Sequence, residues 1–267
     1  MREYISNLAH LHFDSYILFQ SAMASSRTIK ACLFDMDGLL INSEDIYTIS
    51  LTKVLETYGK PPLTWDLKIK LQGRPGPSAS KLVIEHYDLP LTPEELFAKT
   101  TAVQMDLWPT VKFLPGALEL LQYLDTKKIP FALATSSHKL NYDRKTGHLQ
   151  HGFDLFRHHI VTGDDSRIPP GKGKPFPDIW FAALESLNKE RKQHGQDTID
   201  ITECLVFEDG VPGVEAGKAS GAYVIWVPDE RALKVLAGKE KEIIGENNEH
   251  GIILKSLEAF DKTMLGS

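Results

Sequence analysis

Short runs of consecutive apolar residues alternate along the chain with longer stretches in which apolar residues recur every three or four positions. A continuous apolar run with a polar stop is typical of a strand buried on both faces. Such runs cover residues 29–35, 130–135, 203–209 and 222–228, with a weaker one near Ile160. Between them, residues such as Leu118, Leu121 and Leu124 share one face of a helix. The alternation predicts a doubly wound, Rossmann-like α/β fold with a parallel sheet.

Residues 43–111 interrupt this alternation, because they carry helix signals and no convincing strand. Thr92 is suited to be an N-cap, and Pro93 follows it at the first helical position. Gly- and Pro-rich pieces at 59–62 and 73–77 divide the stretch into short helices. We therefore expect an α/β core made of residues 28–42 and 112–267, with a small helical cap domain, residues 43–111, inserted after the first strand. Residues 1–27 are expected to form a poorly ordered extension.

Composition narrows the classes of partner. With 267 residues and 42% hydrophobic residues, the chain can bury a sizeable core. Its net charge of -6 argues against nucleic acid or an anionic membrane as partner, but does not oppose a small anionic substrate. The only two cysteines, Cys32 and Cys204, lie in apolar runs without metal-ligand spacing, which suits a reducing compartment. No apolar run approaches membrane-spanning length, so we expect a cytoplasmic monomer.

Four carboxylates stand at the ends of predicted strands. Asp35 and Asp37 follow the first strand, and Glu208 and Asp209 end the run at 203–209. Because ligands bind outside the carboxyl ends of parallel strands, these side chains should converge. Their mutual repulsion requires a cation, and a set of oxygen ligands without histidine indicates a hard one, Mg2+ above all.

A hydroxyl and an amine accompany the carboxylates. Ser136 follows the run at 130–135, and Lys174 lies in a loop that leads into a helix. Together they provide the hydrogen bonds and the positive charge that a phosphoryl group needs. Both segments also have a purely structural interpretation. Ser137, next to Ser136, is a candidate helix N-cap, and the basic loop that contains Lys174 could simply be solvated. The order of all these residues after strands favours the functional interpretation.

The set resembles a known family. The resemblance rests on Asp35-Met36-Asp37-Gly38, Ser136, Lys174-Pro175-x-Pro177-Asp178 and Phe207-Glu208-Asp209, in this order. These look like the four motifs of the haloacid dehalogenase superfamily, and the likeness spans about residues 28–228. The helical insert stands where that superfamily has a helical cap. Segments such as FALATSS and CLVFEDGVPGVEA resemble the pseudouridine-5'-phosphatase branch in particular. One departure is Asn42, where relatives usually have Asp.

The resemblance implies a mechanism. Asp35 would be the nucleophile that forms an aspartyl-phosphate. Asp37 would protonate the leaving alcohol and then activate water. Ser136 and Lys174 would hold the phosphoryl oxygens, with Lys172 as the rival lysine.

The same resemblance implies the metal ligands and the substrate class. Mg2+ would be held by Asp35, Asp209 and the carbonyl of Asp37, with Glu208 as a direct or water-mediated partner. A closing cap suits a small phosphate monoester such as pseudouridine-5'-phosphate or another nucleoside 5'-monophosphate. Arg74, in a cap loop, either contacts that substrate or is a solvated turn residue.

Other functions stay open at this point. A sugar or polyol phosphatase, or a phosphomutase of the same superfamily, would keep every motif. A receiver-type phosphoprotein would lack the cap, and a hydrolytic dehalogenase would not need the Glu208–Asp209 pair. His148, His151, His158 and His159 are close together in sequence, but no pattern gives them ligand spacing, so we interpret them as surface or packing residues.

Overall fold

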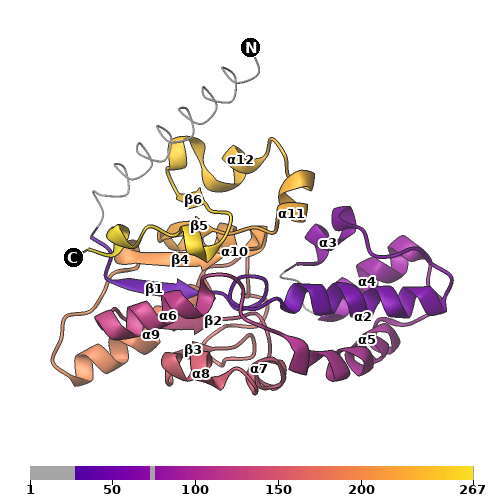
Figure 1. Ribbon diagram of the computed structural model, residues 1–267, viewed down its shortest axis with the longest axis horizontal. Helices are drawn as coiled ribbons and strands as arrows, with labels where there is room; N and C mark the ends of the chain where they lie inside the picture. Colours follow the sequence, from indigo (N-terminus) through magenta and orange to yellow (C-terminus); the bar gives the residue numbers. More distant parts are fainter. Residues whose placement is uncertain (1–27, 73–75, 267) are drawn as a thin grey trace, which may run out of the picture.

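The computed structural model describes residues 28–72 and 76–266. The predicted extension, residues 1–27, and the candidate substrate contact Arg74 therefore lie outside the described residues. One six-stranded sheet forms the core, with strand order β3-β2-β1-β4-β5-β6 and all pairs parallel (Figure 1). The strands are β1 Ala31–Phe34, β2 Phe131–Ala134, β3 Ile160–Val161, β4 Cys204–Glu208, β5 Tyr223–Trp226 and β6 Gly251–Ile253. The predicted α/β fold is confirmed.

The central strands are apolar throughout because both faces of the sheet are covered. All residues of β1, β2, β4 and β5 are buried. The edge strand β6, paired to β5 through Val224 and Gly251, was not predicted from the sequence. It has only three residues and begins with a glycine, so it carries almost no strand signal.

Helices pack on both faces of the sheet. One face carries α6 together with the C-terminal segment, through Leu120, Leu121 and Phe260. The other carries α9, α10 and α12, through residues such as Trp180 and Val214. The helices of this core are α6 Ala117–Lys127, α7 Lys139–Thr146, α8 Gln150–Phe153, α9 Asp178–Gln193, α10 Val211–Ser220, α11 Glu230–Val235 and α12 Glu240–Ile244. Short 3-10 turns are η1 Trp108–Thr110, η2 Asp154–Phe156, η3 Ile201–Glu203, η4 Glu246–Asn248, η5 Leu257–Ala259 and η6 Lys262–Leu265.

Four helices lie between β1 and α6 in the chain. They are α2 Ser43–Thr57, α3 Trp65–Leu71, α4 Gly76–Tyr87 and α5 Pro93–Leu107. Their apolar side chains, among them Leu55, Val83 and Leu96, form a hydrophobic cluster separate from those of the sheet. The predicted N-cap of helix α5, Thr92, is confirmed, since Thr92 and Glu95 exchange side chain-to-backbone hydrogen bonds. In Figure 1 these helices lie beyond the carboxyl end of β1, where a substrate site is expected.

No helix in the described part of the chain combines the length and the apolar character that crossing a membrane requires.

Candidate active site

The carboxyl ends of β1, β2 and β4 meet at one edge of the sheet. β1 lies between the other two, and Phe34 is paired with Phe207 in register. Asp35 therefore stands beside Glu208, the last residue of β4. The parallel sheet thus brings together groups that are more than 170 positions apart in the sequence.

Lys174 joins two of these carboxylates. Its Nζ lies 2.5 Å from Oδ1 of Asp35 and 2.5 Å from Oε1 of Glu208, and it donates to the carbonyl of Ala134 at 3.2 Å. Burial by itself disfavours the charged amine, but the two carboxylates outweigh burial and hold the pKa of Lys174 above its usual value. Lys174 therefore remains a cation in the interior. Lys172, the rival lysine, is exposed, and its Nζ lies 4.1 Å from the centre of the Phe176 ring.

Three carboxylates at this edge of the sheet, two of them bound by Lys174, fit a hard cation. One oxygen from each of Asp35, Glu208 and Asp209 lies within 4.8 Å of the others. Burial and the neighbouring negative charges raise the pKa of Asp35 to about 8 and the pKa of Asp209 well above its usual value. A bound divalent cation would favour the ionised forms, and an all-oxygen set of this kind suits Mg2+. Both oxygens of Glu208 already have hydrogen-bond partners. Oε1 accepts from Nζ of Lys174, and Oε2 accepts from the backbone N–H groups of Asp209 and Gly210.

Two glycines let the backbone approach these carboxylates. Gly38 has φ +86°, and a Cβ there would overlap Oδ2 of Asp209. A Cβ on Gly213, in the first turn of α10, would overlap the carboxylate of Glu208. The backbone at these two glycines therefore packs directly against the carboxylates of Asp209 and Glu208.

Asp37 is surrounded by donors. Oδ1 accepts from Ser43 Oγ at 2.5 Å and from Lys145 Nζ at 2.5 Å, and Oδ2 accepts from Ser137 Oγ at 2.8 Å and from Thr135 Oγ1 at 3.3 Å. Burial by itself would raise the pKa of Asp37. Lys145 and the hydroxyls of Ser43 and Ser137 outweigh burial and hold that pKa below its usual value. Asp37 is therefore ionised in this arrangement.

Sequence reasoning missed two of these donors, Ser43 and Lys145, and interpreted a third, Ser137, as a helix N-cap. The interpretation of Ser137 as a helix N-cap is wrong, because His138 is the N-cap of α7 and the Ser137 hydroxyl donates to Asp37 instead. Lys145 is fully buried, with Nζ 4.8 Å from the ring centre of Tyr47 and 5.2 Å from that of Trp108. A lysine in the last turn of a polar helix gave no sign of this position.

We expect Lys145→Met to lower kcat at least about ten-fold, because Asp37 then loses its only charged donor among the described residues. Lys139→Met is the matched control, since Lys139 is exposed on the same helix. Steady-state kinetics and thermal unfolding of both variants check this. Wild-type kcat in Lys145→Met would show that the ion pair serves stability alone.

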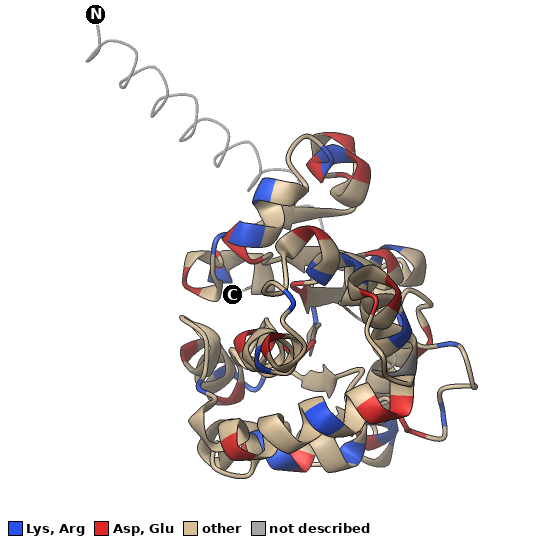
Figure 2. Cartoon of the chain, turned by 90° about the vertical axis from the view of Figure 1, so that its right-hand side faces the viewer, with Lys and Arg blue, Asp and Glu red and all other residues tan. Residues whose placement is uncertain are grey.

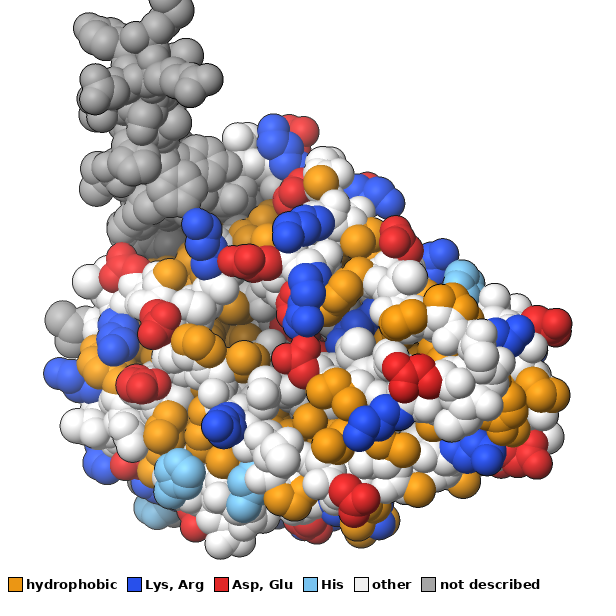
Figure 3. Space-filling model, turned by 45° about the vertical axis from the view of Figure 1, so that its right-hand side comes forward, with side chains coloured by type: hydrophobic (Ala, Val, Ile, Leu, Met, Phe, Trp, Pro, Cys, Tyr) orange, Lys and Arg blue, Asp and Glu red, His pale blue; other side chains and the backbone are white. Residues whose placement is uncertain are grey.

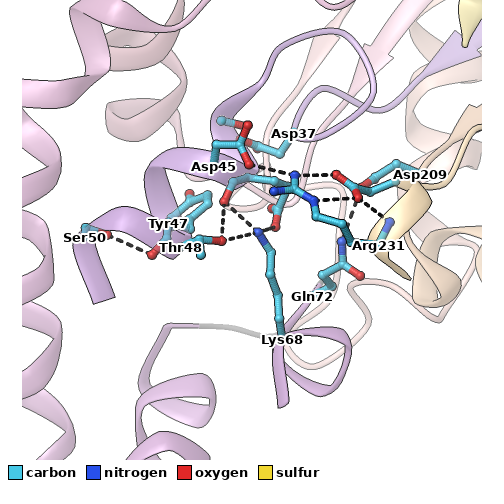
Figure 4. Close-up of polar contacts among 12 residues, drawn as sticks. Asp37, Asp45, Tyr47, Thr48, Ser50, Lys68, Gln72, Asp209 and Arg231 are labelled. Carbon is cyan, nitrogen blue, oxygen red and sulfur yellow. Dashed lines mark hydrogen bonds and ion pairs between the residues drawn. The ribbon is translucent and has the colours of Figure 1, made fainter. Parts of the chain in front are cut away.

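Two polar side chains of the helical insert have different roles: one joins α3 to α2, and the other reaches the site. Nζ of Lys68 on α3 contacts the carbonyl of Glu44 at 2.7 Å and Oγ1 of Thr48 at 2.5 Å (Figure 4). Nε2 of Gln72, just after α3, donates to Oδ2 of Asp209 at 3.4 Å. The insert is thus positioned against the acidic centre of the core.

An ion pair also connects the insert to the core. Arg231 of α11 contacts Asp45 of α2 at 2.8 Å, and its guanidinium lies 4.9 Å from the Trp65 ring centre (Figure 4). Positive and negative side chains are interspersed over the face shown in Figure 3, with no extended basic surface visible there. Lys and Arg positions likewise alternate with Asp and Glu positions along the chain in Figure 2.

The remaining predicted residues lie at the same edge or near it. Ser136 is the second residue after β2 and is exposed, and Gly163 packs against its backbone. Asn42, the departure from the usual Asp, accepts a hydrogen bond from the backbone N–H of Lys112 at 2.8 Å. Asn42 thereby ties together the two chain segments that run between the core and the helical insert.

Comparison with known proteins agrees with this geometry. The model of the haloacid dehalogenase-like hydrolases matches residues 29–221. A Saccharomyces cerevisiae protein named probable pseudouridine-5'-phosphatase is 56% identical, covering 89% of this chain and 97% of that protein. The (DL)-glycerol-3-phosphatase 2 of Arabidopsis thaliana is 35% identical, covering 78% of this chain and 83% of that protein. The crystal structure of a HAD hydrolase, family IA, variant 3, from Entamoeba histolytica shares the fold, with a TM-score of 0.65, 24% identity and coverage of 89% and 98%.

Proposed function

Since the chain belongs to the haloacid dehalogenase-like hydrolases and is a phosphatase of that family, we propose that it hydrolyses pseudouridine-5'-phosphate or a similar nucleoside 5'-monophosphate. The observation that carries the chemistry is the junction of Asp35, Lys174 and Glu208 beside Asp209. This junction brings together the carboxylate nucleophile Asp35, the ammonium group of Lys174 and a set of oxygen ligands for a hard metal ion.

Asp35 attacks phosphorus and forms an aspartyl-phosphate as the P–O bond to the leaving alcohol breaks. Lys174 fixes the Asp35 carboxylate by direct contact, which supports an aligned attack. The amine and the exposed hydroxyl of Ser136 lie at the edge where the phosphoryl oxygens would sit, and both can donate to them.

Asp37 serves the proton transfers. Asp37 is ionised in the arrangement described above, so it first takes up a proton from solvent and then donates that proton to the leaving alcohol. In the second step it accepts a proton from the water that attacks the aspartyl-phosphate, which releases phosphate and restores Asp35. Because both Asp37 oxygens accept hydrogen bonds, the carboxyl group must release a donor to reach the substrate. Ser43 and Ser137 are uncharged and can be exchanged at low cost.

Asp35 and Asp209, the carbonyl of Asp37 and indirectly Glu208 would hold Mg2+, which when bound supplies positive charge to neutralise the phosphoryl group. We expect a chelator to abolish turnover, because Asp35 and Asp209 repel each other and favour protonation without a cation. Mg2+ should restore it. Full activity in metal-free protein, checked by elemental analysis, would exclude this arrangement.

The substrate is tested by kcat/KM over a panel of phosphate monoesters. We expect pseudouridine-5'-phosphate to exceed uridine, hexose and glycerol phosphates, given the 56% identity to the yeast relative. The helical insert stands over the site and makes contact with Asp209 through Gln72, which suits a small substrate. A higher kcat/KM for a phosphopeptide or an oligonucleotide would refute the proposal.

Glycerol 3-phosphate, or another polyol or sugar phosphate, is the second candidate. It is supported by the relative from Arabidopsis thaliana, a (DL)-glycerol-3-phosphatase. The residues that contact phosphate do not read the leaving group, so the same panel decides between the two.

A further inference from the structure

A second group of ligand-type side chains lies away from the active site. His158 and His159 directly precede β3, and Glu190 lies in the last turns of α9. One ligand atom of each lies within 4.8 Å of the others. Oε2 of Glu190 is 2.6 Å from Nε2 of His159 and 3.4 Å from Nε2 of His158. The sequence had given no sign of this ligand geometry, because the carboxylate comes from a helix some thirty positions later.

The separations suit a tetrahedral transition metal. Two ligands about 2.0 Å from Zn2+ at the tetrahedral angle are about 3.3 Å apart. The contacts of 2.6 and 3.4 Å in the cluster bracket that separation, so small side-chain adjustments would admit the ion. Two imidazoles with one carboxylate favour Zn2+ or a similar metal over Mg2+. The Asp35–Glu208–Asp209 group, which is all oxygen, has the opposite preference.

The contact made by the other ring nitrogen of His159 is also typical of a metal-binding histidine. Nδ1 of His159 lies 2.9 Å from Oγ of Ser186, one turn before Glu190 on α9. If Nδ1–H donates to that hydroxyl, Nε2 presents its lone pair toward Glu190. A lone pair and a carboxylate oxygen at this separation repel each other unless a cation lies between them.

A plain ion pair explains the cluster less well. Oε2 of Glu190 is buried and has no donor aimed at it among the described residues, although Nε2 of His159 is close. The two rings lie with centres 4.1 Å apart, so a positive charge on both would be repulsive.

We propose that His158, His159 and Glu190 form a binding site for Zn2+ or a similar transition metal, which joins the start of β3 to the end of α9. The site is distinct from the catalytic centre. The active-site residue Lys174 lies in the loop just before α9, which begins at Asp178. Glu190 is 12 residues further along this helix, which corresponds to about 18 Å along its axis.

The surroundings leave the fourth ligand position open to water. His158 is 67% exposed, and a hollow of about 350 Å³ is lined by His159, Glu190 and His194 among others. Nearby positive charges are engaged elsewhere: Arg157 pairs with Asp125 at 3.2 Å, and Arg191 donates to the carbonyl of Asp197 at 2.7 Å. A cation can therefore reach the cluster.

The test uses full-length protein without a histidine tag, stripped of metal and kept in saturating Mg2+. Titration with Co2+ should give the visible absorption of a tetrahedral site, and Zn2+ should displace it with one ion per chain. We expect His158→Ala and Glu190→Gln to weaken Zn2+ binding at least about ten-fold. Zn2+ should also raise the unfolding temperature of wild-type protein but not of these variants.

Two controls separate this site from others. His151→Ala removes an exposed histidine that packs on Phe113 outside the cluster, and it should bind Zn2+ as the wild type does. Asp209→Asn disables the catalytic metal set and should keep the Co2+ spectrum. Wild-type affinity in His158→Ala and Glu190→Gln, or loss of the spectrum in Asp209→Asn, would overturn the proposal. So would the absence of any tetrahedral spectrum in the wild type.

Discussion

Asp35→Asn is expected to reduce phosphatase turnover by at least about four orders of magnitude, because the amide cannot form the covalent phosphoryl intermediate. Folding should survive, since burial and neighbouring carboxylates already disfavour the charge on Asp35. Steady-state kinetics and acid-quench trapping of the phosphorylated chain measure the effect.

Asp143→Asn is the matched control, because Asp143 is an exposed carboxylate on α7 whose partner is the exposed Lys139. It should leave kcat within about two-fold of the wild type, as surface pairs contribute little. If Asp35→Asn kept near wild-type turnover, or still trapped phosphate, the nucleophile would have to be another residue.

Lys174→Ala is expected to impair both activity and folding. Removing the ammonium leaves Asp35 and Glu208 buried without their shared cation, and breaking a buried pair in this way costs about 3–5 kcal/mol. Turnover should fall by at least about a hundred-fold, because the nucleophile and the phosphoryl group lose the same positive charge. Denaturant unfolding and kinetics with Mg2+ test the two effects separately.

Lys172→Ala provides the comparison within the same loop. Lys172 is exposed, and its contact is the Phe176 ring, so both unfolding free energy and kcat should stay close to wild type. The reverse result, with Lys172→Ala the more damaging change, would reassign the phosphate-binding lysine.

Much of the fold could be predicted because its signals are local. β1 and β4 are continuous apolar runs, and such runs must be covered on both faces. The N-cap at Thr92 was equally readable, because capping depends on residues three positions apart. β6 was missed, since three residues carry too little pattern to distinguish a strand from a loop.

The sequence by itself determined the parallel α/β core and the convergence of Asp35, Asp37 and Glu208 at one edge, because side chains that follow parallel strands meet there. Tertiary structure alone decided that Lys145 reaches Asp37 and that Glu190 reaches His159. Both contacts join a helix to a distant segment, and which residue of a helix faces which neighbour depends on packing. Strand ends can be located from the chain, whereas helix rotation is fixed only when the core is assembled.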